Sequence, residues 1–230
     1  MSASHPRAGD LPRGGSLLSN RLKEAARGFL APVVRLAKRL GITPNRVTVL
    51  GFGVIVVAAG LVAIGQLLIG AVVLVAGSLL DAVDGALARA TGGSTAFGNF
   101  LDSTLDRAAE AILYAGIVAY FLRASVDPLG PVLLALAALS GSFMVSYTRA
   151  KAEALGVTAS VGLAPRTERL VLIVAGIGLA GLGLENGLTG AIAIIAALAG
   201  ATTVQRIWHV RQQVEETPAA AGIGDITRER

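Results

Sequence analysis

The chain has 230 residues, of which 53% are hydrophobic and 15% are charged, with a mean hydropathy of +0.68 and a net charge of +5. About a quarter of the residues of a soluble domain are usually charged, so this composition argues against a water-soluble globular protein. The absence of cysteine excludes disulfides, thiolate catalysis and cysteine-ligated metal centres. The two histidines, His5 and His209, lie near opposite ends of the chain, which disfavours a histidine-rich metal site.

The N-terminal segment divides into two parts ahead of the first long apolar stretch. Residues 1–19 are rich in Gly, Pro and Ser, and we expect them to be disordered. Residues 20–42 are expected to contain a juxtamembrane amphipathic helix that lies on an anionic leaflet. Its apolar positions are Val33, Leu36, Ala37 and Leu40, and its basic positions are Arg35, Lys38 and Arg39. The alternative interpretation is an ordinary basic flank beside a membrane span.

Six mostly apolar segments follow, at about 47–64, 67–87, 100–122, 129–147, 170–184 and 188–207. A helix of about 20 residues crosses a ~30 Å hydrocarbon core, so each segment is a candidate span. Connections such as Gly65-Gln66 are very short, which makes consecutive helices antiparallel neighbours. We predict an all-α integral membrane protein with six transmembrane helices in a domain at 43–212, followed by a disordered tail at 213–230. The alternative, one soluble domain, would need helices that are apolar all round.

The positions of lysine and arginine predict the orientation of the chain in the membrane. Nine basic residues precede the first span, and the loop between spans four and five falls on the same side. The opposite side carries only Arg123. We therefore expect both termini to face the cytoplasm from the cell membrane. No uninterrupted apolar stretch precedes Arg35, so no cleaved signal peptide is expected.

Four aspartates, Asp81, Asp84, Asp102 and Asp106, lie in or at the edge of spans two and three, and Glu110 is a possible fifth acid. Each aspartate at a helix centre costs roughly 2.5–3.5 kcal/mol on insertion scales, so the group needs a compensating charge. The spacings i, i+3 and i, i+4 put each pair on one helical face, and a short loop can bring the pairs together. Carboxylate oxygens suit Mg²⁺ or Mn²⁺, either as two ions or as one ion beside a carboxylate base.

Two neighbouring residues suit a phosphate ligand at these acids. Gly85 leaves room against the helix backbone, and Arg89 places a cation one turn further on. Metal-assisted phosphoryl chemistry is one interpretation of the group. An ion-coupled transporter is a second, and simple ion pairs with Arg89 and Arg107 are a third.

The residues themselves resemble a known family. The stretch Asp81-Ala-Val-Asp84-Gly85-Ala-Leu-Ala88-Arg89, followed by Gly98, Asp102 and Asp106, is similar to the full signature of the CDP-alcohol phosphotransferases. Every fixed position is present at the family's spacing, and the six spans and Thr43-Pro44-Asn45 extend the resemblance to roughly residues 40–210.

The resemblance implies an enzyme that joins a CDP-linked lipid to an alcohol in a cytosol-facing cavity and releases CMP. It implies that Asp81, Asp84 and Asp102 hold one metal and that Asp81, Asp102 and Asp106 hold a second. Asp106 would also deprotonate the attacking hydroxyl. The implied cytidine diphosphate contacts are Thr43, Pro44, Asn45, Arg46, Gly85, Arg89 and Thr95. The implied partners are these substrates, membrane lipid and a second copy in a homodimer, with no nucleic acid.

Four cations near the end of span four and the start of span five could bind a phosphorylated acceptor: Arg149, Lys151, Arg166 and Arg169. The alternative is a basic loop that only sets topology. This region resembles the phosphatidylinositol-phosphate synthase branch of the family, which implies CDP-diacylglycerol and inositol phosphate as substrates. Glycerol 3-phosphate, giving phosphatidylglycerophosphate, is the second candidate acceptor, and serine is disfavoured because it would not need the extra cations.

Overall fold

A computed structural model describes residues 31–93, 95–159, 161–163, 165–184 and 186–216. The predicted disordered segment at 1–19 lies outside these residues, as does residue 217 onward of the predicted tail. The regular structure of the described residues is entirely helical, which confirms the all-α fold class. Residues 31–39 form a helix within the predicted amphipathic segment. The longer helices are α2 (Pro44–Ala63), α3 (Leu67–Ala90), α4 (Ala96–Ala124), α5 (Leu129–Ala154), α6 (Arg166–Gly181) and α7 (Asn186–Glu216).

Four of the described helices, α2, α3, α5 and α7, are long and apolar enough to cross a membrane. The other two differ for separate reasons. The helix α4 carries Asp102, Asp106, Arg107 and Glu110 in its first half, and α6 has only 16 residues. Large apolar side chains such as Val72 and Val204 remain 69% and 67% exposed on the helix surfaces, as expected for faces that meet lipid. The chain is therefore a multi-pass helical membrane protein.

Several helix ends differ from the predicted spans: α4 begins four residues earlier than predicted, and α5 continues past residue 147 to Ala154. The helix α6 begins at Arg166, four residues before the predicted start, and ends at Gly181 because Gly183 turns the chain with a φ of +92°. The helix α7 continues to Glu216, past residue 212, the predicted end of the domain. The polar residues of this last segment are mostly Gln and Glu, which have high helix propensity. Their polarity therefore does not terminate α7.

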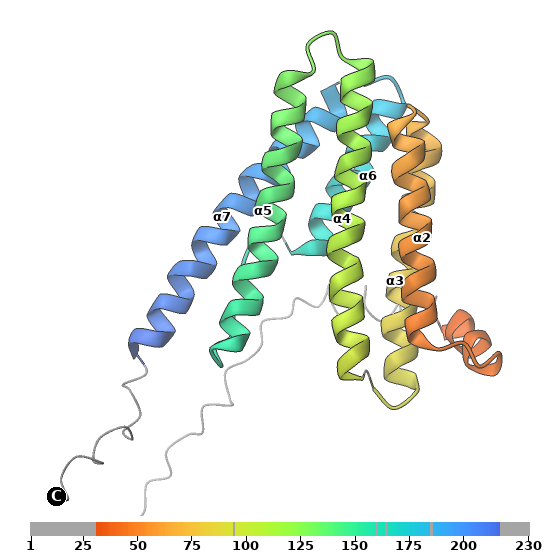
Figure 1. Cartoon of the computed structure of the whole chain (residues 1–230), viewed down its shortest axis with the longest axis vertical. Coiled ribbons are helices and arrows are strands. Elements are labelled where there is room, and N and C mark those ends of the chain that lie inside the picture. Colours follow the sequence, from red (N-terminus) through yellow and green to blue (C-terminus); the bar gives the residue numbers. More distant parts are fainter. Residues whose placement is uncertain (1–30, 94, 160, 164, 185, 217–230) are drawn as a thin grey trace, which may run out of the picture.

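The helices pack as two groups, which are joined by α6 and by the contact between α4 and α5. The helix α2 packs against α3 and α4, α5 packs against α4 and α7, and α6 contacts both α3 and α7 (Figure 1). Glycine permits the closest crossing, because a Cβ at Gly116 of α4 would lie 2.4 Å from the backbone oxygen of Ala59 in α2. The core between the helices is built from buried Ile, Leu, Val and Ala together with Tyr114 and Phe121.

The short turn between α3 and α4 positions the acidic residues. The two helices run antiparallel, so the last turns of α3 lie beside the first turns of α4 (Figure 1). Thr95 caps α4 by accepting a hydrogen bond from the Gly98 amide at 2.9 Å. Figure 1 also shows that α6 starts well above the lower ends of α4 and α5.

The helix at 31–39 lies against the same end of the bundle (Figure 1). Its Ala37 belongs to a small cluster with Val47, Val83 and Leu87, and Val34 packs against that cluster. The Lys38 ammonium donates a hydrogen bond to a carbonyl at the end of α3 at 3.4 Å. Val33, Leu36 and Leu40 are exposed, as are Arg35, Lys38 and Arg39.

Candidate functional site

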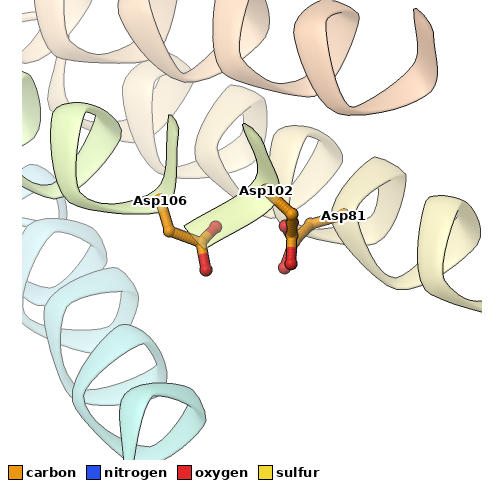
Figure 2. A group of neighbouring side chains, drawn as sticks. All are labelled: Asp81, Asp102 and Asp106. Carbon is orange, nitrogen blue, oxygen red and sulfur yellow. The ribbon is translucent and has the colours of Figure 1, made fainter. Parts of the chain in front are cut away.

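Three of the four predicted aspartates meet in one place. Asp81 of α3 and Asp102 and Asp106 of α4 each offer a carboxylate oxygen, and these oxygens all lie within 4.8 Å of one another. Figure 2 shows the three side chains pointing into the same space from the two helices. Helical spacing brings Asp102 and Asp106 onto one face of α4, and the antiparallel turn brings Asp81 opposite them.

The fourth aspartate, Asp84, lies one turn beyond Asp81 on the wall of an adjoining cavity that Asp102 also lines. Its side chain is buried, and its Oδ2 atom has no hydrogen-bond partner among the described residues. A buried carboxylate oxygen without a partner is costly unless a ligand completes it. The four acids supply only hard oxygen donors, so the residues present fit Mg²⁺ or Mn²⁺.

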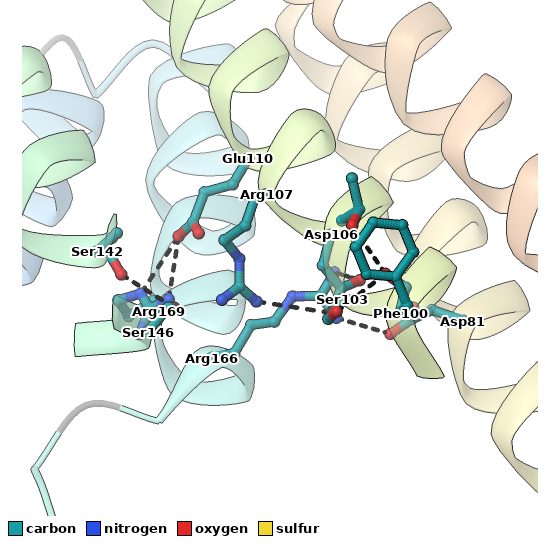
Figure 3. Close-up of polar contacts among 11 residues, drawn as sticks. Asp81, Phe100, Ser103, Asp106, Arg107, Glu110, Ser142, Ser146, Arg166 and Arg169 are labelled. Carbon is teal, nitrogen blue, oxygen red and sulfur yellow. Dashed lines mark hydrogen bonds and ion pairs between the residues drawn. The ribbon is translucent and has the colours of Figure 1, made fainter. Parts of the chain in front are cut away.

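Arginines balance part of the negative charge of this cluster. Arg166, the first residue of α6, bonds Asp81 Oδ2 through Nη1 at 3.1 Å and Asp106 Oδ1 through Nη2 at 2.6 Å. Arg107 Nη2 lies 3.7 Å from Asp106 Oδ2. Figure 3 shows Arg166 reaching from α6 to the aspartates on the two other helices. Three close carboxylates repel one another, and these cations lower that repulsion.

A cavity of about 380 Å³ opens beside the aspartates, between α2, α3 and α4. Five of the seven residues expected to contact cytidine diphosphate line it: Thr43, Pro44, Asn45, Gly85 and Thr95. Arg46 and Arg89 are not among its lining residues. Arg89 lies close by, since a Cβ at Gly85 would be 3.4 Å from Arg89 Nη1. The assignment of all seven residues to a nucleotide stays a prediction.

Sequence reasoning missed several residues of this cavity wall: Thr48, Ala88, Thr91, Gly93, Gly98 and Asn99. Ala88 and Gly98 are fixed positions of the family signature, which was a usable signal for both. Thr48 lies one turn after Pro44, and Asn99 lies one turn after Thr95, so helical spacing from predicted contacts would have found them. The sequence carries no comparable signal for Thr91 and Gly93, which lie at the turn after α3.

The four cations predicted to bind the acceptor phosphate do not form one cluster. Arg149 pairs with Glu153 one turn along α5 at 2.8 Å, with both side chains more than half exposed, and Lys151 is exposed on the same helix. Arg166 and Arg169 instead line a small cavity of about 30 Å³ together with Asp106. The last turn of α5 and the first turn of α6 differ in depth, which separates the two pairs (Figure 1).

A buried ion pair lies one turn deeper than Asp106. Glu110 Oε1 accepts hydrogen bonds from Arg169 Nε at 3.3 Å and Nη2 at 3.1 Å, and the Arg169 side chain is only 2% exposed (Figure 3). The sequence predicted Glu110 only as a fifth acid beside the four aspartates. It is absent from the cluster of three aspartates and holds α4 to α6 instead.

Fold and site together define a helical, multi-pass membrane protein with a cluster of carboxylates, a candidate cation site, beside a cavity. The sequence model described as CDP-alcohol phosphatidyltransferase matches residues 41–205, and the chain belongs to this family. This confirms the resemblance found in the aspartate signature.

Similar proteins with curated names come from archaea and actinobacteria. The chain is 37% identical over 206 residues to the archaetidylinositol phosphate synthase of Methanothermobacter thermautotrophicus, an alignment that covers 89% of this chain and 100% of that protein. It is 39% identical over 184 residues to the phosphatidylinositol phosphate synthase of Mycolicibacterium smegmatis, covering 78% of this chain and 82% of that protein.

Crystal structures of the phosphatidylinositol phosphate synthase of Mycobacterium tuberculosis are similar in fold. The structure with CDP-DAG bound gives a TM-score of 0.75 at 32% identity, covering 86% of this chain and 98% of that one. The structure in complex with manganese and citrate gives a TM-score of 0.76, covering 85% and 96%.

Proposed function

We propose that this protein transfers the phosphatidyl group of CDP-diacylglycerol to inositol phosphate and releases CMP. The archaeal and actinobacterial relatives named above are archaetidylinositol phosphate and phosphatidylinositol phosphate synthases, and the Mycobacterium tuberculosis enzyme has been crystallised with CDP-DAG. The observation that carries the proposal is the position of the aspartates. Three carboxylates lie within 4.8 Å of one another at the edge of a cavity of about 380 Å³.

Asp81, Asp84, Asp102 and Asp106 are the proposed ligands of Mg²⁺ or Mn²⁺, with two ions sharing the carboxylates. The manganese complex of the mycobacterial relative supports a divalent cation at this site. When bound, the ions would neutralise the phosphate charge and help orient the two reacting oxygens. The unpartnered buried Oδ2 of Asp84 supports its inclusion as the fourth ligand.

Asp106 is the proposed base for the acceptor hydroxyl. Its carboxylate belongs to the aspartate cluster and also lines the small cavity beside Arg166 and Arg169, so it lies between the proposed metal ligands and the proposed acceptor region. The acceptor oxygen forms a bond to the phosphorus that carries diacylglycerol, and the bond from that phosphorus to the bridging oxygen of CMP breaks. The hydroxyl proton passes to Asp106, and CMP leaves with the electron pair.

The nucleotide would occupy the cavity that Thr43, Pro44, Asn45, Gly85 and Thr95 line, with Arg46 and Arg89 at its margin. For the acceptor phosphate, Arg166 and Arg169 are favoured over Arg149 and Lys151, because only the first pair shares a cavity wall with Asp106. A guanidinium fork matches the oxygens of a phosphate.

The proposed membrane arrangement has six spans, with α4 and α6 completing the four apolar helices and the helix at 31–39 lying along the cytoplasmic leaflet. The exposed apolar and basic side chains of that helix support an interfacial position. Basic residues at the same end of the bundle support cytoplasmic termini and a cytoplasmic site. A homodimer is proposed from the family resemblance.

The test is to identify the lipid product formed by the purified protein in detergent with Mg²⁺ and CDP-diacylglycerol. Inositol 3-phosphate, glycerol 3-phosphate, inositol and serine are supplied separately. A phosphatidylinositol phosphate product with the first acceptor alone is expected. A phosphatidylglycerophosphate product instead would overturn the acceptor. No product with any acceptor, together with ion-driven solute flux in sealed vesicles, would favour a transporter.

A further inference from the structure

The guanidinium of Arg166 bridges two aspartates that come from different helices. Nη1 contacts Asp81 on α3 and Nη2 contacts Asp106 on α4, at 3.1 and 2.6 Å. One guanidinium is therefore shared between two carboxylates of the cluster and does not form a bidentate ion pair with a single carboxylate. The two carboxylates are the same ones whose oxygens converge with Asp102.

The Arg166 guanidinium and a divalent cation would compete for the same carboxylate oxygens. Both need the oxygens of Asp81 and Asp106, and both carry positive charge, so they repel each other strongly at separations of a few ångströms. A divalent ion that takes these carboxylates as ligands must therefore displace the Arg166 side chain or weaken both of its ion pairs. The displacement requires only side-chain rotation, because Arg166 lies at the very start of α6 and is 31% exposed.

A displaced Arg166 side chain would still lie beside a small cavity. Arg166 also lines the small cavity that it shares with Asp106 and Arg169. A guanidinium that has left the aspartates keeps its five donors, which suit the oxygens of a phosphate. The same arginine can thus serve the carboxylates or an incoming phosphate, depending on whether a metal ion holds the acids.

We propose that Arg166 is a built-in counter-ion that competes with the divalent cation for Asp81 and Asp106 and binds the acceptor phosphate once the cation displaces it. This inference rests on the proposed function and adds an order to it, with the metal ahead of the phosphorylated acceptor. Because binding linkage is reciprocal, the acceptor must in turn strengthen metal binding. Arg166 is a positioning residue for the metal ligands and a binding residue for the phosphate.

The first experiment measures Mn²⁺ binding to the full chain in detergent by electron paramagnetic resonance, with no substrate present. Arg166→Gln is expected to bind Mn²⁺ about tenfold more tightly than the wild type, as expected for the loss of two competing ion pairs of modest strength. Arg166→Lys should lie between the two, because an ammonium is a point charge without the fork. Arg123→Gln removes the same charge near the end of α4 away from the acids and should not change the affinity.

The second experiment measures the Mn²⁺ affinity of the wild type and of Arg166→Gln with and without inositol 3-phosphate. The acceptor should tighten Mn²⁺ binding in the wild type and have a much smaller effect in Arg166→Gln. Equal or weaker Mn²⁺ binding by Arg166→Gln, eluting as a single folded species, would overturn the inference. If that variant aggregates, two other results would overturn the inference. One is a wild-type Mn²⁺ affinity that inositol 3-phosphate does not change, and the other is an Arg166→Lys variant that binds Mn²⁺ as tightly as the wild type. Product formation by the wild type tests the proposed function separately.

Discussion

Replacing Arg169 by methionine is expected to destabilise the protein by about 3–5 kcal/mol, the usual cost of breaking a buried ion pair by removing one partner. The structure sets the size of this effect. Arg169 is 2% exposed and Glu110 is 9% exposed, and both bonds of the pair end on one oxygen of Glu110. Methionine keeps much of the side-chain volume, so lost packing contributes little and the stranded Glu110 carboxylate dominates.

A double-mutant cycle separates the charge effect from packing. The pair Glu110→Leu with Arg169→Met should recover most of the loss, because replacing both partners by apolar groups is close to neutral. The matched control is Arg149→Met, which breaks an exposed pair with Glu153 and should cost less than about 1 kcal/mol. The free energy of unfolding is measured by circular dichroism during titration with sodium dodecyl sulfate in mixed micelles.

Two results would refute this reasoning. If Arg169→Met costs no more than Arg149→Met, the buried pair does not hold α4 to α6. If the double variant loses as much as the sum of its single variants, the two side chains are not energetically coupled.

Three further substitutions test the site and the packing. Asp106→Asn should lower turnover by 10²-fold or more while CDP-diacylglycerol binding is kept, and normal turnover would remove Asp106 as the base. Gly98→Ala adds a methyl group between two side chains that line the proposed nucleotide cavity, so the KM for CDP-diacylglycerol should rise with kcat little changed. An unchanged KM would place the nucleotide elsewhere. Gly116→Ala would put a Cβ 2.4 Å from the Ala59 carbonyl oxygen and should lower the melting temperature in detergent. The control Gly60→Ala adds its Cβ in open space and should not lower it. Equal melting temperatures for the two variants would contradict this packing of α2 on α4.

Local periodicity was sufficient to predict the helices and the convergence of the aspartates. Hydropathy located α2, α3, α5 and α7, because each is a continuous apolar run of membrane length. The i, i+4 spacing of Asp102 and Asp106, and a turn too short to separate α3 from α4, brought Asp81 opposite them. These features depend only on residues that are near in sequence.

The acceptor region could not be predicted in the same way. Whether Arg166 reaches the aspartates depends on the depth at which α6 begins, and contacts between α6 and both α3 and α7 fix that depth. The burial of Arg169 likewise depends on Glu110, a residue 59 positions earlier in the chain. A basic loop has the same composition whether its side chains face water, a phosphate or a carboxylate.

The most direct test of the central claim is CMP release by the purified protein with CDP-diacylglycerol and inositol 3-phosphate, measured with Mg²⁺ and again after chelation. We expect stoichiometric CMP release that requires both the divalent ion and inositol 3-phosphate and that is lost in Asp106→Asn. CMP release that continues after chelation would contradict the proposed function. So would CMP release that occurs with glycerol 3-phosphate and not with inositol 3-phosphate.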